Sequence, residues 1–336
     1  MELFYSALSD AGNVRSSNED YLFAGNLGQD EYLFIVADGM GGHNAGEIAS
    51  RKAVSVFVSE LEKSREEETK NGIGEELKRI LLEVNEALMI EGSKSPRRKG
   101  MGTTLSALYI KGESGYIAHV GDSRIYRYLN DGEDKGNKPG QLMQLTEDHS
   151  FVGKLLKNGF ITEEEARSHP KRNVIYQSIG LRKEINIQVM ESIPIKKGQK
   201  YLLCSDGLSG VVPAGEIVES LKLKGASTSA VAKQLVKKAK RNGGPDNISV
   251  IVVSTEMGKC DSTDLADTIK IVDSYLAPGK RKKKIAFLVL LGLLILLLAA
   301  LIYLVIVTMD ADGQPLAWGE NRFDSVIEIL GNRGKG

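Results

Sequence analysis

Carboxylates recur at the ends of apolar segments in this sequence, and three of the four aspartates concerned lie beside a glycine. A further acidic pair, Glu19-Asp20, stands just before the apolar segment YLF. Carboxylates gathered at one end of a sheet would repel one another severely unless cations neutralised them. The pattern therefore predicts a bound metal ion. The four aspartates are Asp38 in LFIVADG, Asp122 in HVGDSR, Asp206 in LLCSDG and Asp246 in GGPDNIS.

The ligand types favour a hard divalent ion. Oxygen ligands without cysteine or histidine at matching spacing favour magnesium or manganese over zinc. Several carboxylates suffice for two ions, and such pairs activate water for attack at phosphorus. A single Asp-Gly would indicate only a turn. The glycine-rich stretch VADGMGGHNAG after Asp38, however, would leave room for a backbone carbonyl ligand, and Arg15 offers a planar fork for phosphate oxygens.

Hydrophobic periodicity divides the first 255 residues into short strands and amphipathic helices. Runs of strands interrupted by long helix pairs favour antiparallel sheets layered with helices, the α+β class. The predicted helices are Gly46–Lys63, Glu75–Ile90 and Ser227–Arg241. The predicted strands are Tyr32–Ala37, Thr104–Ile110, Gly115–Val120, Ile125–Tyr128, Tyr201–Ser205 and Ile248–Val253.

Three segments interrupt this pattern. Asn130–Gly140 reads as a polar hairpin loop, and Phe151–Gly180 as a mobile excursion with short helical pieces beside the core. The residues 257–284, which end in a basic run, lack periodicity and read as a linker. The only cysteines are Cys204 and Cys260, too few for a disulfide framework and typical of a reducing compartment.

The C-terminal region predicts a membrane anchor. Ile285–Val307 contains no charged residue in 23 positions. As a helix it would be roughly 35 Å long, enough to cross a hydrocarbon core of about 30 Å, whereas a buried core helix is shorter and rarely apolar all round. Five basic residues, Lys280–Lys284, precede it, so the N-terminal side is expected in the cytoplasm and the tail 308–336 outside. The N-terminus shows no cleaved leader pattern.

Seven segments together resemble, in order and spacing, the motifs of the metal-dependent type 2C serine/threonine protein phosphatases, especially the bacterial branch. The resemblance covers about residues 3 to 255. It implies a four-layer α-β-β-α sandwich over 1–256, with a dinuclear site at one end of two antiparallel sheets. The segments are VRSSNEDYLF, VADGMGGHNAG, MGTTLSALYI, HVGDSRIYRY, LTEDHS, LCSDGLSG and GGPDNISVIVV.

The resemblance also implies a role for each candidate residue. Asp38 matches the bridging aspartate, and Gly39 matches the backbone-carbonyl ligand. Arg15 matches the arginine that binds the substrate phosphate, and Phe151–Gly180 corresponds to the family's flap. The remaining matches are Glu19 for one metal, Asp206 and Asp246 for the other, Asp122 with Asp206 for a third and weaker metal, and Asp20 and Asn247 for positions that orient ligands or water.

The general acid is the point at which the sequence departs from the animal members. Those carry a histidine after the Asp-Gly, where this chain has Met40. His43 and water at the third metal site remain alternative proton donors. His119, inside a strand pattern, is expected to be a hydrogen-bonded interior histidine.

The function expected from these features is a membrane-anchored protein phosphatase. It would hydrolyse phosphoserine and phosphothreonine with metal-activated water, on phosphoproteins that include a cognate serine/threonine kinase and its substrates. The alternative is a pseudophosphatase that binds or senses with the same fold, although no metal carboxylate is missing. Balanced charge, 44 basic and 44 acidic residues, disfavours a nuclease or any nucleic-acid partner. Cysteine phosphatase chemistry is excluded because Gly210, not arginine, follows Cys204 by six positions.

Overall fold

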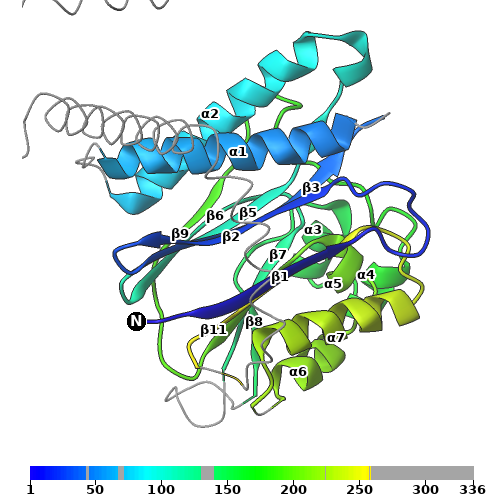
Figure 1. The fold of residues 1–336 in the computed structure, drawn as a ribbon. Helices are drawn as coiled ribbons and strands as arrows, with labels where there is room; N and C mark the ends of the chain where they lie inside the picture. Colours follow the sequence, from blue (N-terminus) through cyan, green and yellow to red (C-terminus); the bar gives the residue numbers. More distant parts are fainter. Residues whose placement is uncertain (43–44, 67–71, 130–139, 224, 257, 259–336) are drawn as a thin grey trace, which may run out of the picture. The chain divides into compact units, whose positions relative to one another are not determined.

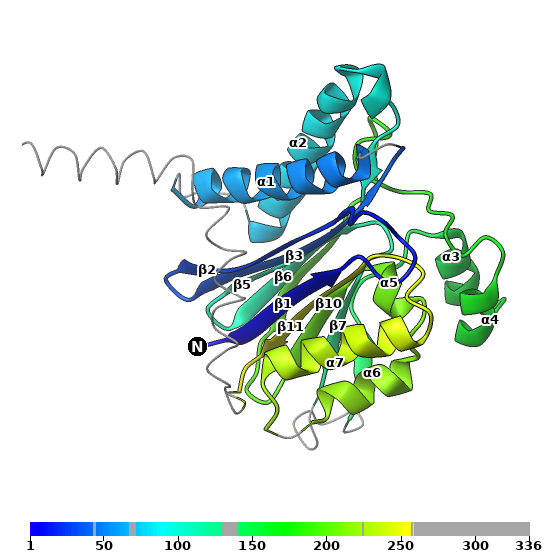
Figure 2. The same cartoon turned by 45° about the vertical axis from the view of Figure 1, so that its right-hand side comes forward.

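The described part of the chain is built of two stacked antiparallel sheets with helices on both outer faces (Figures 1 and 2). The structure is a computed structural model and describes residues 1–42, 45–66, 72–129, 140–223, 225–256 and 258. In the first sheet, strands lie in the order β1 (Phe4–Asp10), β11 (Ile248–Ser254), β10 (Lys200–Cys204), β7 (Arg124–Tyr128) and β8 (Leu142–Gln144).

The second sheet carries the longest strands and a two-residue extension. All its pairings are antiparallel, and β4 (Gly102–Thr103) pairs with the end of β3. Its order is β2 (Asp20–Gly28), β3 (Glu31–Met40), β5 (Leu105–Lys111), β6 (Ser114–Val120) and β9 (Gln188–Pro194).

Two pairs of helices form the outer layers. One pair covers the second sheet and the other covers the first, while two short helices stand beside the sandwich (Figure 2). The pairs are α1 (Ala45–Glu66) with α2 (Ile73–Ser93), and α6 (Ala214–Leu221) with α7 (Thr228–Arg241). The shorter helices are α3 (Phe151–Lys157), α4 (Glu163–Ser168), α5 (Asp206–Ser209) and a 3-10 turn at Pro96–Arg98.

Three apolar clusters hold these four layers together, because each interface buries its own set of side chains. Phe57 and Leu81 belong to the cluster between the first helix pair and its sheet. Phe34 and Tyr201 lie in the cluster between the sheets, and Leu235 in the one under α7. The expected α-β-β-α sandwich is therefore confirmed for the described residues.

All six predicted strands and all three predicted helices are present, with ends shifted by a few residues. Five strands were not predicted, β1, β2, β4, β8 and β9, and neither were the helices α5 and α6. The edge strands β1 and β9 have mostly half-exposed side chains, so they lack the apolar run that marks a buried strand. These segments become strands through the partners they pair with.

Beyond Gly258, the predicted linker and the predicted span Ile285–Val307 lie outside the described residues, as does the tail 308–336. Most of the predicted loop Asn130–Gly140 lies outside them too. In the part of the chain that is described, no helix is both long and apolar enough to cross a membrane.

Candidate active site

The strand ends that carry the acidic residues meet at one end of the sandwich. Asp20 faces Asp38 across the β2–β3 ladder, so the register of that hairpin pairs two of the predicted carboxylates. Asp206 is the first residue of α5, just after β10, and Asp246 lies two residues before β11. Residues from both sheets are thereby brought together, since β10 and β11 belong to the first sheet and β2 and β3 to the second.

One cavity of about 380 Å³ contains nearly all the predicted site residues. Asp20 does not line it. That side chain is buried, and its Oδ2 accepts a 2.8 Å hydrogen bond from Ser205 Oγ. The predicted residues that line the cavity are Arg15, Glu19, Asp38, Gly39, Asp122, Asp206, Asp246 and Asn247.

The strand that bears Asp38 does not end there, contrary to the sequence interpretation. β3 continues to Met40 because its last residues pair with β4, with Gly39 opposite Thr103. The Asp38 amide donates to Thr104 Oγ1 at 2.9 Å, and the Asp38 carbonyl accepts from Thr104 N, also at 2.9 Å. Asp38 is therefore held by backbone on a continuous strand rather than on a loop.

The glycines after Asp38 are required by close packing. A Cβ on Gly39 would lie 2.1 Å from the carbonyl oxygen of Gly46 and 2.5 Å from that of Glu19. A Cβ on Gly46 would lie 2.5 Å from Oε2 of Glu19. The absence of side chains thus lets the start of α1 and the Glu19 carboxylate approach the end of β3, and this geometry places Glu19 in the cavity.

Electrostatic repulsion is concentrated in this cavity. Burial raises the pKa of Asp38 well above its usual range, and the charges of Asp20 and Asp206 raise it further. Burial and then the charge of Asp206 raise the pKa of Asp122, while burial and then the charge of Asp246 raise that of Asp206. In Asp20, burial raises the pKa to about 8. Without a cation, these carboxylates are held in their charged form only at a free-energy cost.

The donor set fits divalent cations in its chemistry. Oδ1 of Asp206 is buried and has no hydrogen-bond partner, which is unusual for a carboxylate oxygen unless an ion binds there. No group of three or more acidic, histidine or cysteine side chains among the described residues already stands in a metal-binding arrangement. The carboxylates nevertheless line one cavity together.

Asn247 connects the loop before β2 to this cavity. Its Oδ1 accepts from the amide of Glu19 at 2.8 Å, and its Nδ2 donates to the carbonyls of Ala11 and Ser17 at 3.1 and 2.9 Å. The side chain is buried. The side-chain oxygen thus holds the Glu19 backbone, and the side-chain nitrogen holds the preceding loop.

Arg15 lies at the rim, where its Nη2 donates to Oδ2 of Asp246 at 2.9 Å. Its side chain is 54 % exposed, so the guanidinium can reach a ligand from solvent. The pairing with Asp246 is a second role that the sequence did not predict. A phosphate at the site would compete with Asp246 for Arg15, and a metal ion would compete with Arg15 for Asp246.

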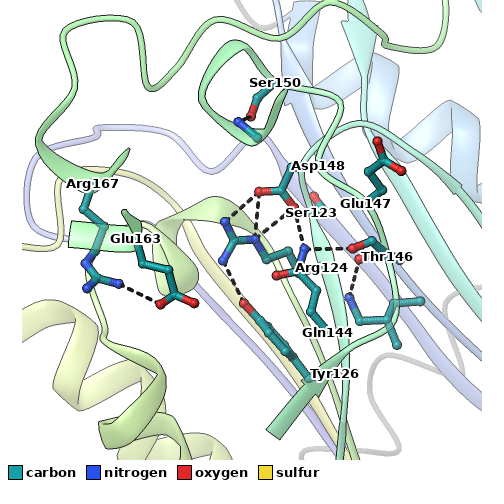
Figure 3. Close-up of polar contacts among 12 residues, drawn as sticks. Ser123, Arg124, Tyr126, Gln144, Thr146, Glu147, Asp148, Ser150, Glu163 and Arg167 are labelled. Atoms are coloured by element: carbon teal, nitrogen blue, oxygen red, sulfur yellow. Dashed lines mark hydrogen bonds and ion pairs between the residues drawn. The ribbon is translucent and has the colours of Figure 1, made fainter. Parts of the chain in front are cut away.

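An ion pair between the partly buried Arg124 and the buried Asp148, which the sequence interpretation did not assign, stands beside the site (Figure 3). Arg124 Nη2 lies 2.6 Å from Oδ2 of Asp148, and Arg124 Nη1 donates to the Tyr126 hydroxyl at 2.8 Å. Gln144 Nε2 donates to Oδ1 of Asp148 at 2.8 Å. Both charged residues belong to the quoted motifs HVGDSRIYRY and LTEDHS, and Arg124 stands just before the predicted strand Ile125–Tyr128.

The predicted flap adjoins this ion pair. Its helices α3 and α4 are capped by the preceding residues Ser150 and Thr162, whose side chains accept hydrogen bonds from the third amide of each helix. A smaller cavity of about 180 Å³ lies between these helices and α5 and shares Asp122, Asp206 and Asp246 with the first. The flap therefore borders the carboxylates directly.

The histidines and Met40 can be placed only in part. His119 is buried, with Ser106 Oγ 2.8 Å from Nδ1 and the Glu147 carbonyl 3.0 Å from Nε2, so the expected interior role is confirmed. Met40 lines the cavity beside Asp38. His43 lies outside the described residues, and the choice of proton donor stays open.

Two face-packed antiparallel sheets with a carboxylate-lined cavity at one end define the class of metal-dependent phosphoester hydrolases that the motifs predicted. The chain belongs to the protein phosphatase 2C family, whose profile matches residues 13–243. It is 35 % identical over 249 residues to the serine/threonine phosphatase stp of Listeria innocua, covering 74 % of this chain and 94 % of that protein.

Mycobacterial PstP is a second relative. The chain is 39 % identical over 251 residues to the serine/threonine protein phosphatase PstP of Mycobacterium tuberculosis, covering 74 % of this chain but only 44 % of that protein. A solved structure of the PstP catalytic domain in complex with two manganese ions has a TM-score of 0.61 and 36 % identity, covering 75 % of this chain and 97 % of that one. The chain thus spans less than half the length of PstP.

Proposed function

We propose that this chain is a protein serine/threonine phosphatase that hydrolyses phosphoserine and phosphothreonine at a dinuclear manganese or magnesium site. The observation that supports this most directly is the gathering of Glu19, Asp38, Asp206 and Asp246 from both sheets into one cavity, with Arg15 at its rim. A solved structure of the PstP catalytic domain is in complex with two manganese ions, and the motif resemblance implies that these carboxylates of the present chain would hold such ions.

In this proposal the metal ions, when bound, would supply an activated water for attack at phosphorus and would neutralise the developing charge. Arg15 would bind the phosphate oxygens from the open side, because its fork of donors matches their geometry. Asn247 and Asp20 would keep the acidic side chains in place through the hydrogen bonds described above. The flap would form the wall against which the rest of the substrate lies.

The test is hydrolysis of a phosphoserine peptide by the full-length protein with manganese, with magnesium and with EDTA. We expect turnover with either ion, none in EDTA, and recovery when manganese is restored. Turnover that persists undiminished in EDTA would contradict the metal assignment. Tight phosphopeptide binding without any turnover in manganese would favour the pseudophosphatase alternative.

Arg15→Ala is expected to raise KM for a phosphopeptide about ten-fold while kcat changes less, because a charge-assisted contact to phosphate contributes about 1.5 kcal/mol. Steady-state kinetics on the full-length protein would measure both constants. Arg15→Lys keeps the charge without the fork and is expected to recover only part of the loss. If manganese affinity fell instead and KM held, Arg15 would be a structural partner of Asp246.

We further propose that Ile285–Val307 anchors the protein in the cell membrane, with the catalytic domain in the cytoplasm and residues 308–336 outside. The support is the sequence alone, namely the uncharged run and the basic block before it. This location would place the catalytic domain near membrane-bound phosphoproteins, among them a cognate serine/threonine kinase.

Cysteine labelling in intact cells would test this orientation. A cysteine introduced at Ser325 should react with a membrane-impermeant maleimide, whereas the natural Cys260 should react only after lysis. Cys204 is buried and should not react in the folded protein, so it provides an internal control. Labelling of Cys260 before lysis, with protection at position 325, would reverse the topology.

A further inference from the structure

The outer surface of α7 is strongly basic. This helix carries five basic residues and no acidic one, in a chain whose charges balance overall. Three of them, Lys238, Lys240 and Arg241, lie in its last turn, where they interact favourably with the helix dipole. Lys233 and Lys237 lie earlier, so the dipole does not account for them.

Four of these five residues line a groove between α7 and β1, which we call the α7 groove. Its floor is apolar, formed by Leu8 and Val236. Among the described residues, it is lined by Lys233, Lys237, Lys240, Arg241 and Asn13, and by no carboxylate. Lys240 is paired with Asp10 at 3.0 Å, but Lys237 and Arg241 are exposed and make no ion pair with any described residue.

The α7 groove is joined to the catalytic cavity by the loop between β1 and β2. Asn13 Nδ2 donates to the carbonyls of Lys240 and Gly243 at 2.7 and 3.1 Å, and Asn13 N donates to Gly244 O at 2.8 Å. Two residues further on, Arg15 lines the catalytic cavity. The C-terminal end of α7 and this loop lie at the same end of the sandwich in both views (Figures 1 and 2). A polypeptide bound at Arg15 could continue over the loop into the groove.

We propose that the α7 groove binds an acidic segment of the phosphoprotein substrate, at some distance along its chain from the phosphoresidue. This inference rests on the proposed phosphatase function. Charge complementarity favours acidic side chains, the apolar floor suits their aliphatic parts or a neighbouring apolar residue, and continuity with Arg15 favours the substrate over a separate ligand. The catalytic cavity would then recognise the phosphate, while the groove would select among phosphoproteins.

The experiment uses the full-length protein with manganese and pairs of phosphoserine peptides. One member of each pair carries four glutamates and the other carries four glutamines, separated from the phosphoserine by Gly-Ser spacers of increasing length. We expect the acidic peptide to have a lower KM, by about five-fold at the best spacer length, because a few exposed ion pairs each contribute a small part. Rising ionic strength should remove the advantage.

The double variant Lys237→Gln/Arg241→Gln should lose this advantage and leave the glutamine peptide unaffected. The matched control is Lys52→Gln/Lys78→Gln, which removes the same charge from exposed positions on α1 and α2, the opposite outer layer. Equal KM values for both peptides at every spacer length would overturn the inference, as would an equal loss in the control variant.

Two further measurements separate the possible failures. Hydrolysis of p-nitrophenyl phosphate should be the same in wild type and in both double variants, since this substrate does not reach the groove. Its absence in wild type would contradict the proposed function and, with it, the groove's role in substrate choice. Loss of binding to phosphatidylserine vesicles in the α7 variant, with peptide KM unchanged, would show that the groove faces a membrane and would overturn the inference.

Discussion

Asp38→Asn is expected to lower kcat on a phosphopeptide about a thousand-fold, corresponding to about 4 kcal/mol of transition-state stabilisation. Asp38 lines the cavity, and in the proposed function it would help to hold the metal ions, so an amide there removes a negative charge that would attract them. Asp206→Asn should have a similar effect, because the buried Oδ1 of Asp206 has no other partner. Asp30→Asn, an exposed position, is the control.

The variant Asp38→Asn should have a larger free energy of unfolding than wild type when no metal is present. Asp38 has a raised pKa in the folded state, so its contribution to stability is present below its ordinary pKa of about 4 and is lost as pH rises through the raised value. Asp38→Asn avoids that loss. In EDTA, urea unfolding should therefore show Asp38→Asn to be more stable at pH 8, with the difference vanishing near pH 4.

Manganese should reverse this order at pH 8, because an ion that binds only the folded state stabilises wild type more than a variant lacking a ligand. Phosphopeptide turnover and urea stability with and without manganese together identify the cause of inactivity. An inactive variant that is also unfolded would leave a folding defect as the explanation. Full activity in Asp38→Asn, or a manganese-induced stabilisation equal to that of wild type, would refute the role of Asp38.

Gly39→Ala is expected to reduce the free energy of unfolding by about 3 kcal/mol, at the upper end of the cost of overpacking. The added Cβ would lie 2.1 Å from the Gly46 oxygen and 2.5 Å from the Glu19 oxygen, both in the backbone, so neither can move aside by changing a rotamer. Relieving the clash must separate β2 or the start of α1 from β3. Glu19 would then leave the cavity, and activity should fall as well.

Gly42→Ala is a matched control three residues away, because a Cβ at Gly42 meets no atom within 4 Å. Its unfolding free energy, measured in urea, should remain within about 0.5 kcal/mol of wild type, as for an ordinary surface substitution. Equal stability of the two variants would mean that the approach of Glu19 and Gly46 to Gly39 does not constrain the fold.

The sequence by itself determined the local elements and the chemistry of the site. Tyr32–Ala37 and Ile248–Val253 are apolar runs bounded by turn residues, and Asp38 and Asp246 stand at their ends, so both the strands and the candidate ligands could be read along the chain. Such patterns arise from contacts between near neighbours, which depend only on residue order.

Only the tertiary structure decided which of these strand ends lie next to one another and which other residues lie beside them. The strand β1 forms because it pairs with β11, more than 200 residues away, and no local pattern marks its half-exposed side chains. The pairing of Arg124 with Asp148 and the contact of Asn13 with Lys240 likewise depend on strand register and on how the layers pack. These contacts link residues distant in sequence, and their free energy is gained only when the sheets and helices assemble as a whole.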